Sequence, residues 1–207
     1  MKIGIIGTGN VGSTLGRRFA QSGHTVAFGS RKPDAPEMKQ LAEIPNARVT
    51  LPKEAAQSSD IVVLATPWPS TLEAVRALGD LSGKILLDCT NPLKPDLSGL
   101  VVGTTSSAAE QLAEVAPGAR VVKIFNTVGA GVMANPAFGA DAATMFYCGD
   151  DAGAKAAAKE LAAQLGFDPV DAGALTKARV IEPFALLWIG LALGGHGPNI
   201  AFKLMHR

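Results

Sequence analysis

The sequence has little of what several classes of protein require. Its 207 residues include 2 cysteines and 3 histidines, and 19 basic against 18 acidic residues leave a net charge of +1. Cys89 and Cys148 lie in apolar, strand-like segments with no CxxC motif and no neighbouring histidine, so we expect two reduced core thiols and no metal site. The balanced charge leaves no basic surface for nucleic acid, and we expect none to bind.

Targeting and membrane segments are also lacking. No charged leader or cleavage site accompanies the apolar run at residues 3–6, so we expect no signal peptide and a cytoplasmic protein. The most apolar stretch, residues 183–195, is shorter than the about 20 residues that cross a bilayer. We expect it to form a buried or interface helix, covered by the acceptor or by a second subunit of a homodimer. Arg179 and Glu182, three residues apart, are expected to pair with each other.

The amino-terminal residues predict a βαβ unit that binds a dinucleotide. A strand at residues 3–6, a helical pattern and a second strand at residues 24–28 surround the motif Gly7-Thr8-Gly9-Asn10-Val11-Gly12. In such a unit Gly7 permits the tight turn, Gly9 lets backbone approach a pyrophosphate, and Gly12 lets the helix pack closely on the strand. Free N–H groups at the helix start then bind the phosphates. A glycine turn without a ligand is the alternative.

The second strand ends without the acidic residue that normally binds the ribose hydroxyls of NAD. Ser30, Arg31 and Lys32 occupy this place, and the first carboxylate is Asp34. A hydroxyl, a guanidinium and an ammonium can all face a phosphate dianion, whereas a carboxylate would repel it. The turn therefore favours NADP over NAD, with an ordinary solvated loop as the alternative.

Alternating strands and helices along the chain predict an α/β fold, a Rossmann doubly wound parallel sheet with a short C-terminal helical appendage. The expected strands cover residues 3–6, 24–28, 49–51, 60–66, 84–89, 119–125, 145–148 and 169–171. We assign residues 1–175 to one NADP-binding Rossmann domain. Residues 176–207 are expected to form two helices, broken at residues 194–198, that complete the acceptor site, a dimer interface or both.

The candidate site lies beyond the carboxyl ends of the strands, where such sheets bind ligands. The candidate cofactor contacts are Gly7, Thr8, Gly9, Asn10, Val11, Gly12, Ser30, Arg31, Lys32, Thr66, Pro67, Trp68, Asn91, Pro92, Asn126, Thr127 and Val128. Asn91 and Asn126 can hydrogen-bond a ribose or carboxamide, or merely close turns. Trp68 can wall the nicotinamide or acceptor pocket, or cover the core.

No side chain is identified as a catalytic acid. Tyr147 lies inside a strand, His24 precedes the second strand on the side away from the site, and Lys123 is expected to extend its charged tip to the sheet edge. His196, in GGHGPN, is either a proton donor that reaches the pocket from the tail or a turn residue at the break between the two helices. Bound NADP implies hydride transfer, and a planar redox acceptor takes hydride without the proton donor that a ketone or imine requires.

Segments along nearly the whole chain resemble the NADP-dependent coenzyme F420 reductases. They are the glycine motif, GSR after the second strand, the TPW turn, SSAAEQLAE, VVKIFNT, CGDD and DAGALTKAR with the following Glu182. In that family hydride passes directly between NADP and a deazaflavin, without a catalytic acid. The resemblance implies NADP contacts at Thr8, Asn10, Val11, Ser30 and Arg31. It also implies a deazaflavin near residues 66–68, 91–92 and 126–130 and the carboxy-terminal helices.

Two residues depart from the archaeal pattern of the family: Asn126 stands where a histidine is found, and Gly129 where a proline is found. The family also includes many bacterial members of unknown acceptor. It resembles the cytosolic oxidoreductase domain of eukaryotic metalloreductases, which pass hydride to flavin. We therefore expect an NADP-dependent oxidoreductase with coenzyme F420, FMN or FAD as its acceptor. A non-catalytic NADP-binding sensor and a small-carbonyl or imine reductase are the alternatives.

Overall fold

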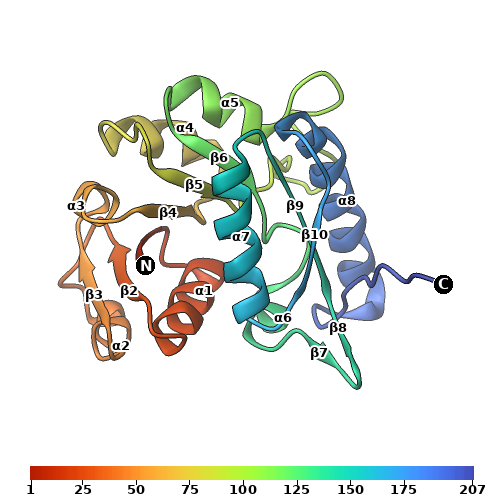
Figure 1. Ribbon diagram of the computed structural model, residues 1–207, viewed down its shortest axis with the longest axis horizontal. Coiled ribbons are helices and arrows are strands. Elements are labelled where there is room, and N and C mark those ends of the chain that lie inside the picture. Colours follow the sequence, from red (N-terminus) through yellow and green to blue (C-terminus); the bar gives the residue numbers. More distant parts are fainter.

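An eight-stranded sheet organises the chain in the computed structural model, which describes residues 1–207 (Figure 1). The strands are β1 (Lys2–Ile6), β2 (Thr25–Gly29), β3 (Ala47–Thr50), β4 (Ile61–Leu64), β5 (Ile85–Asp88), β6 (Arg120–Lys123), β9 (Thr144–Gly149) and β10 (Asp168–Asp171). Their order in the sheet is β10-β9-β6-β5-β4-β1-β2-β3. The first six strands follow the order 3-2-1-4-5-6 of a Rossmann fold, which confirms the predicted fold class.

The sheet is parallel from β1 to β6, but β9 and β10 run in the opposite direction. β9 pairs antiparallel with β6, with Lys123 opposite Cys148, and β10 pairs parallel with β9. The connection from β6 to β9 contains only the five-residue helix α6 (Ala130–Ala134) and a hairpin of β7 (Ala137–Phe138) and β8 (Asp141–Ala142). It lacks the long helix that returns a chain across a sheet, so β9 begins at the edge where β6 ends. The predicted parallel sheet thus contains one antiparallel pair, β6 and β9.

Helices cover both faces of the sheet (Figure 1). The helices other than α6 are α1 (Asn10–Gln21), α2 (Lys39–Ala42), α3 (Pro52–Gln57), α4 (Trp68–Ala77), α5 (Ala108–Val115), α7 (Ala152–Gln164) and α8 (Ala178–Leu191). One buried cluster of 30 residues joins α1, α2, α6 and α7 to one face, and a second of 20 residues joins α3, α4, α5 and α8 to the other. Because neighbouring strand residues point to opposite faces, the central strands contribute to both clusters.

The C-terminal segment contains one helix where we expected two. Helical turns run from Leu175 to His196, over 22 residues, with a kink at Gly195, whose φ of 112° is non-helical, and they end before Gly197, whose φ is 73°. Residues 197–207 contain no helix.

The helical segment Leu175–His196 has a mean hydropathy of 1.4 over its most apolar window and could cross a membrane by length and composition alone. Our argument that the apolar stretch is too short was therefore wrong. Glu182 of this segment is nevertheless fully buried against the sheet.

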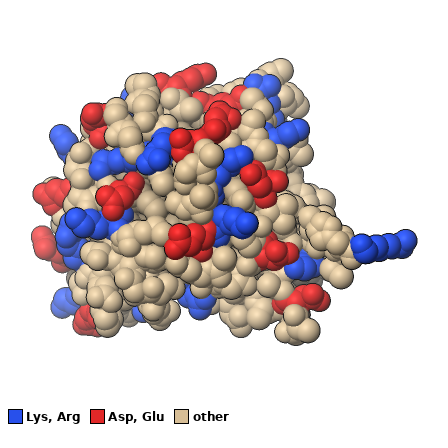
Figure 2. Space-filling view, viewed as in Figure 1, with Lys and Arg blue, Asp and Glu red and all other residues tan.

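Charged side chains are intermixed on the surface shown in Figure 2, where lysines and arginines alternate with aspartates and glutamates. The two cysteines are buried and unpaired, as expected. Burial raises the pKa of Cys89, and it raises the pKa of the Cys148 thiol to about 12. Both thiols are therefore in the protonated, unreactive form at neutral pH.

Candidate dinucleotide and acceptor site

The glycine turn after β1 has the geometry that its sequence predicts. Gly7 adopts φ = 104°, and a Cβ there would lie 2.5 Å from the carbonyl oxygen of Ala65. A Cβ at Gly12 would lie 1.9 Å from the carbonyl oxygen of Gly7, so only glycine lets α1 approach the turn this closely. Gly9 instead faces open space, with no atom within 4 Å of an added Cβ. Two of the glycines thus serve packing, and the third leaves room for a ligand.

The start of α1 is free to bind an anion. Its N-cap is Gly9, no side chain caps it, and its first turn contains no acidic residue. The first backbone bond of the helix runs from the Ser13 N–H to the Gly9 oxygen at 2.9 Å. The preceding N–H groups and the positive end of the helix dipole therefore point toward the open space beside Gly9, where a pyrophosphate would be stabilised.

Alanine substitutions at these glycines should separate packing from binding. Gly12→Ala should lower the free energy of unfolding by about 1 to 3 kcal/mol, because the new Cβ forces α1 away from the turn. Gly9→Ala should leave the melting temperature unchanged and weaken NADPH binding. Thermal unfolding and calorimetric titration of both variants measure these effects. A Gly12→Ala protein as stable as the wild type would contradict the packing described here.

The turn after β2 carries two free cations beside the glycine turn. β2 pairs with β1 so that Gly29 lies opposite Ile6, which places Ser30 next to the start of the glycine motif. The Ser30 hydroxyl accepts a hydrogen bond from the Lys32 backbone N–H at 3.1 Å. Arg31 and Lys32 are exposed and belong to none of the ion pairs. Asp34 is exposed and makes no hydrogen bond, so no carboxylate competes for these cations.

The turn after β4 closes on itself. Trp68 is the first residue of α4 and only 9% exposed, and it packs in the core cluster with residues of α5 and α8. The Thr66 hydroxyl is hydrogen-bonded to the hydroxyl of Thr71 at 2.8 Å. Of the two interpretations of Trp68, the structure therefore favours the core residue over the pocket wall.

Asn91 and Asn126 join the turns after β5 and β6. The side-chain amide of Asn91 donates to the Asn126 carbonyl, and the amide of Asn126 donates to Asn91 Oδ1, both at 3.0 Å. Phe125, just before, is buried and adopts φ = 61°, a left-handed conformation that turns the chain out of β6. Thus Asn91 closes a turn, and the pair holds the two strand ends together.

Two buried polar atoms, one in Asn126 itself and one in the next residue, have no hydrogen-bond partner. Asn126 Oδ1 and Thr127 Oγ1 are buried and make no hydrogen bond. Because buried polar atoms are nearly always paired in folded proteins, these two atoms at the carboxyl edge of the sheet are available to hydrogen-bond a ligand. The side chains of the flanking Pro92 and Val128 are buried and apolar.

Three charged side chains are buried beneath these turns, where the sequence did not lead us to expect them. Lys123 Nζ lies 2.8 Å from Asp88 Oδ2 and 3.0 Å from Glu182 Oε1, and all three side chains are fully buried. Lys123 therefore does not reach the sheet edge as we expected, because β9 and α8 cover it. The available signal was a single charge in each of two apolar strands, in LLDCT and VVKIF.

Burial and charge act in opposite directions on this cluster. Burial alone would lower the pKa of Lys123, but the Asp88 and Glu182 carboxylates hold that pKa above its ordinary value. Burial raises the pKa of Glu182, and the nearby Lys123 ammonium offsets part of this effect.

The expected pairing of Glu182 with Arg179 was wrong. Arg179 instead forms a two-pronged ion pair with Glu110 of α5, at 2.6 Å for the closer contact.

The other titratable candidates form no hydrogen bond with the turns of the site. Tyr147 is buried within β9, and His24 precedes β2 at the opposite edge, where it is hydrogen-bonded to Gln164. His196 is exposed on the last turn of the C-terminal helix and makes no hydrogen bond. The candidate contacts in the turns after β4, β5 and β6 themselves include no histidine, tyrosine, lysine or carboxylic acid.

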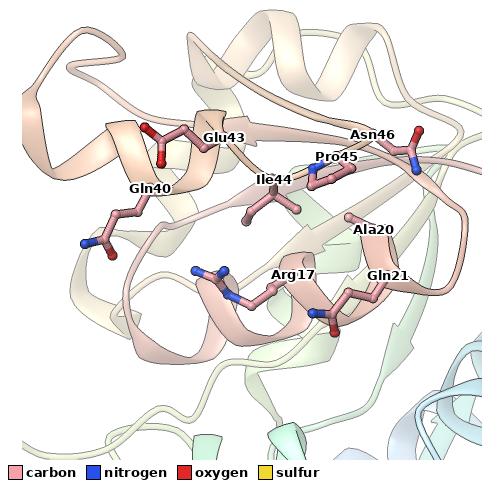
Figure 3. A pocket seen from close by; sticks show the side chains of 8 residues that line it. All are labelled: Arg17, Ala20, Gln21, Gln40, Glu43, Ile44, Pro45 and Asn46. Carbon is pink, nitrogen blue, oxygen red and sulfur yellow. The ribbon is translucent and has the colours of Figure 1, made fainter.

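A hollow of about 490 Å³ lies elsewhere, between α1 and the segment from α2 to β3 (Figure 3). It is lined by Arg17, Ala20, Gln21, Gln40, Glu43, Ile44, Pro45 and Asn46. Gln21 ends α1 and Asn46 precedes β3, so the hollow opens toward the amino edge of the sheet, opposite the candidate site.

Comparisons with known proteins agree with this arrangement. A family model described as NADP oxidoreductase coenzyme F420-dependent matches residues 2–92, from β1 to the turn after β5. The F420-dependent NADP reductase of Methanocaldococcus jannaschii is 33% identical over 219 residues, covering 98% of this chain and 94% of that protein. A solved structure from Arthrobacter sp. FB24, provisionally named an F420-dependent NADP reductase, superimposes with a TM-score of 0.91, 36% identity and full coverage of both chains.

A eukaryotic relative is much longer. Metalloreductase STEAP3 of Rattus norvegicus is 35% identical over 189 residues, which cover 89% of this chain but only 36% of that protein. The chain thus spans about a third of the metalloreductase and nearly all of the methanogen reductase. On the strength of that end-to-end similarity, the chain belongs to the family of coenzyme F420-dependent NADP oxidoreductases.

Proposed function

We propose that this protein transfers hydride between NADPH and coenzyme F420 at the carboxyl edge of its sheet. Family membership supports the reaction, and one observation carries the choice of NADP. This observation is the turn Ser30-Arg31-Lys32, whose two cations have no carboxylate partner and lie beside the uncapped start of α1. A phosphate on the adenosine ribose would satisfy them.

The residues of this edge fit a bound dinucleotide. The N–H groups at the start of α1 would hold the pyrophosphate beside Gly9, and the turn after β2 would hold the 2′-phosphate. Asn126 Oδ1 and Thr127 Oγ1 would gain their missing partners from the nicotinamide half. When bound, NADPH supplies the hydride and F420 accepts it. The protein itself contributes position and exclusion of water, since no acid lies among these turns.

The C-terminal segment, residues 176–207, is proposed to cover the acceptor side of the site. A Cβ at Gly129 would lie 2.9 Å from the Trp188 ring and 3.0 Å from the Pro198 carbonyl oxygen. The Trp188 indole N–H donates to the Ile200 carbonyl at 2.7 Å, which fastens the tail to α8. Trp188 and the tail therefore occupy the space beside Gly129 that a larger residue would need. Residues 1–175 are proposed to bind NADP.

Assays of NADPH oxidation with F420, FMN, FAD and a set of quinones test the acceptor. We expect the highest kcat/KM with F420. Turnover with FMN or FAD but not with F420 would identify a flavin as the acceptor. Tight NADPH binding without any turnover would indicate that the protein is an NADP sensor. Reduction of a ketone or imine that is lost in His196→Ala would contradict the proposal in favour of a carbonyl or imine reductase.

A homodimer through α8 is also proposed. Val180 and Leu187 lie two turns apart on one face of this helix and are 65% and 52% exposed. Apolar side chains in such a row usually contact a partner, and a second copy offers a matching row. We expect light scattering to show a dimer for the wild type and a monomer for Leu187→Glu. Lys159→Glu, at an exposed position of α7, is the control and should remain a dimer. A monomeric wild type would contradict the proposal.

A further inference from the structure

The buried charge cluster Asp88, Lys123 and Glu182 connects the C-terminal helix to the two turns that carry Asn91 and Asn126. Asp88 ends β5, Lys123 ends β6, and Glu182 lies in α8. Lys123 bridges the two carboxylates at 2.8 and 3.0 Å. Three elements that are distant in sequence thus meet at one ammonium group.

On the strand side, the cluster holds the residue next to Asn91. Lys123 Nζ donates to the carbonyl oxygen of Thr90 at 2.5 Å. Asp88 Oδ1 accepts from the backbone N–H of Thr90 at 2.8 Å and from its hydroxyl at 2.7 Å. Thr90 is therefore fixed by three hydrogen bonds from the cluster, and Asn91, which follows it, is bonded twice to Asn126.

On the helix side, the cluster holds α8 against α5. The Glu182 carboxylate accepts from the backbone N–H groups of Ala108 and Ala109, in the first turn of α5, at 3.0 and 3.3 Å. The positive end of that helix dipole thereby offsets the excess negative charge of two carboxylates around one ammonium. Six residues further along α8, Trp188 packs against Gly129, beside the turn after β6. The position of α8 relative to the acceptor side is thus set at two points.

Stability alone gives a weak reason for such a cluster. Burying charges costs desolvation energy, and well-packed apolar replacements are often as stable. A charge cluster differs from apolar packing in that its hydrogen bonds fix atoms in direction as well as in distance. Here the atoms that it fixes belong to the residue before Asn91 and to the helix that covers the turn after Asn126.

We propose that Asp88, Lys123 and Glu182 are positioning residues for hydride transfer, which hold the Asn91–Asn126 pair and helix α8 at the spacing that brings donor and acceptor rings together. This inference rests on the proposed function, because it requires two ligands that meet at this edge. The charges themselves are buried beneath the site and contact neither ligand.

The test compares Glu182→Gln, which keeps the size of the side chain but removes its charge, with Arg179→Gln, which breaks the ion pair between α8 and α5. A third variant, Asp88→Asn/Lys123→Met/Glu182→Leu, removes all the buried charge. We expect Glu182→Gln and the triple variant to lower kcat for acceptor reduction by about 10-fold or more, since a 1 Å misplacement costs on the order of 100-fold. The Kd for NADPH should change by a smaller factor than kcat in both, because the turns proposed to hold the pyrophosphate and the 2′-phosphate are remote from the cluster, and only the contacts of the Asn126 turn with the nicotinamide half would be disturbed.

Two further measurements separate positioning from stability. Arg179→Gln should keep kcat within about 2-fold of the wild type even where its melting temperature falls as far as that of Glu182→Gln. In the protein without ligands, the side-chain amide signals of Asn91 and Asn126 in NMR spectra should shift or broaden in the Glu182→Gln and triple variants, and not in Arg179→Gln.

A triple variant with wild-type kcat, or unchanged asparagine signals in Glu182→Gln, would overturn the proposal. If no acceptor is turned over by the wild type, the proposed function fails by itself, and the asparagine signals still decide whether the cluster positions the pair.

Discussion

In Arg31→Ala, the Kd for NADPH is expected to rise by roughly 10- to 150-fold, equivalent to about 1.5 to 3 kcal/mol for a lost charge-assisted contact. The Arg31 guanidinium is exposed and has no carboxylate partner, so nothing inside the protein competes for it. The affinity for NADH should hardly change, because NADH lacks the phosphate that we propose this side chain contacts. Calorimetric titration of the variant with both dinucleotides measures the two effects.

Arg17→Ala is the matched control for this substitution. Arg17 is also an exposed arginine of the same βαβ unit, but it lines the hollow of Figure 3 near the opposite edge. Its removal changes the net charge equally and should leave both affinities unchanged. An equal loss of NADPH and NADH affinity in Arg31→Ala would mean that Arg31 contacts a part that the two dinucleotides share.

Lys123→Met is expected to lower the free energy of unfolding by about 3 to 5 kcal/mol, because it leaves the buried Asp88 and Glu182 carboxylates without their cation. Denaturant-induced unfolding at neutral pH measures the loss. Lys159→Met, at an exposed position of α7, should change stability by less than about 0.5 kcal/mol.

The loss in Lys123→Met should shrink as the pH is lowered. Burial already raises the pKa of Glu182 above its ordinary value of 4.5, and removing the ammonium raises it further. A carboxyl whose pKa is higher in the folded than in the unfolded state takes up its proton preferentially when folded, so folding gains stability as the pH falls through that range. A loss that grows toward acid pH would contradict this reasoning.

The parts of the site that depend on local geometry could be predicted from the sequence. Gly7 and Gly12 are required by a backbone conformation and a close contact, and both requirements arise within the βαβ unit itself. The turn Ser30-Arg31-Lys32 follows directly from the end of β2, so its place beside the glycine motif comes from the pairing of two neighbouring strands.

The parts that depend on contacts between distant segments could not be predicted. Lys123 has the pattern of a strand residue with an exposed tip, but it is buried against Asp88, 35 positions earlier in the chain, and Glu182, 59 positions later. Trp68 follows a strand end, as a site residue would, but it is only 9% exposed and belongs to a buried cluster that also includes residues of α5 and α8. The reversal of β9 depends on the shortness of α6, which a periodic sequence pattern does not indicate.

Calorimetric titration of the wild-type protein with NADPH and with NADH tests most directly whether the turn after β2 recognises the 2′-phosphate. The unpaired cations at this turn predict that NADPH binds at least roughly tenfold more tightly than NADH. Equal affinities for the two dinucleotides would show that Ser30, Arg31 and Lys32 form an ordinary solvated loop, and would contradict the proposed choice of cofactor.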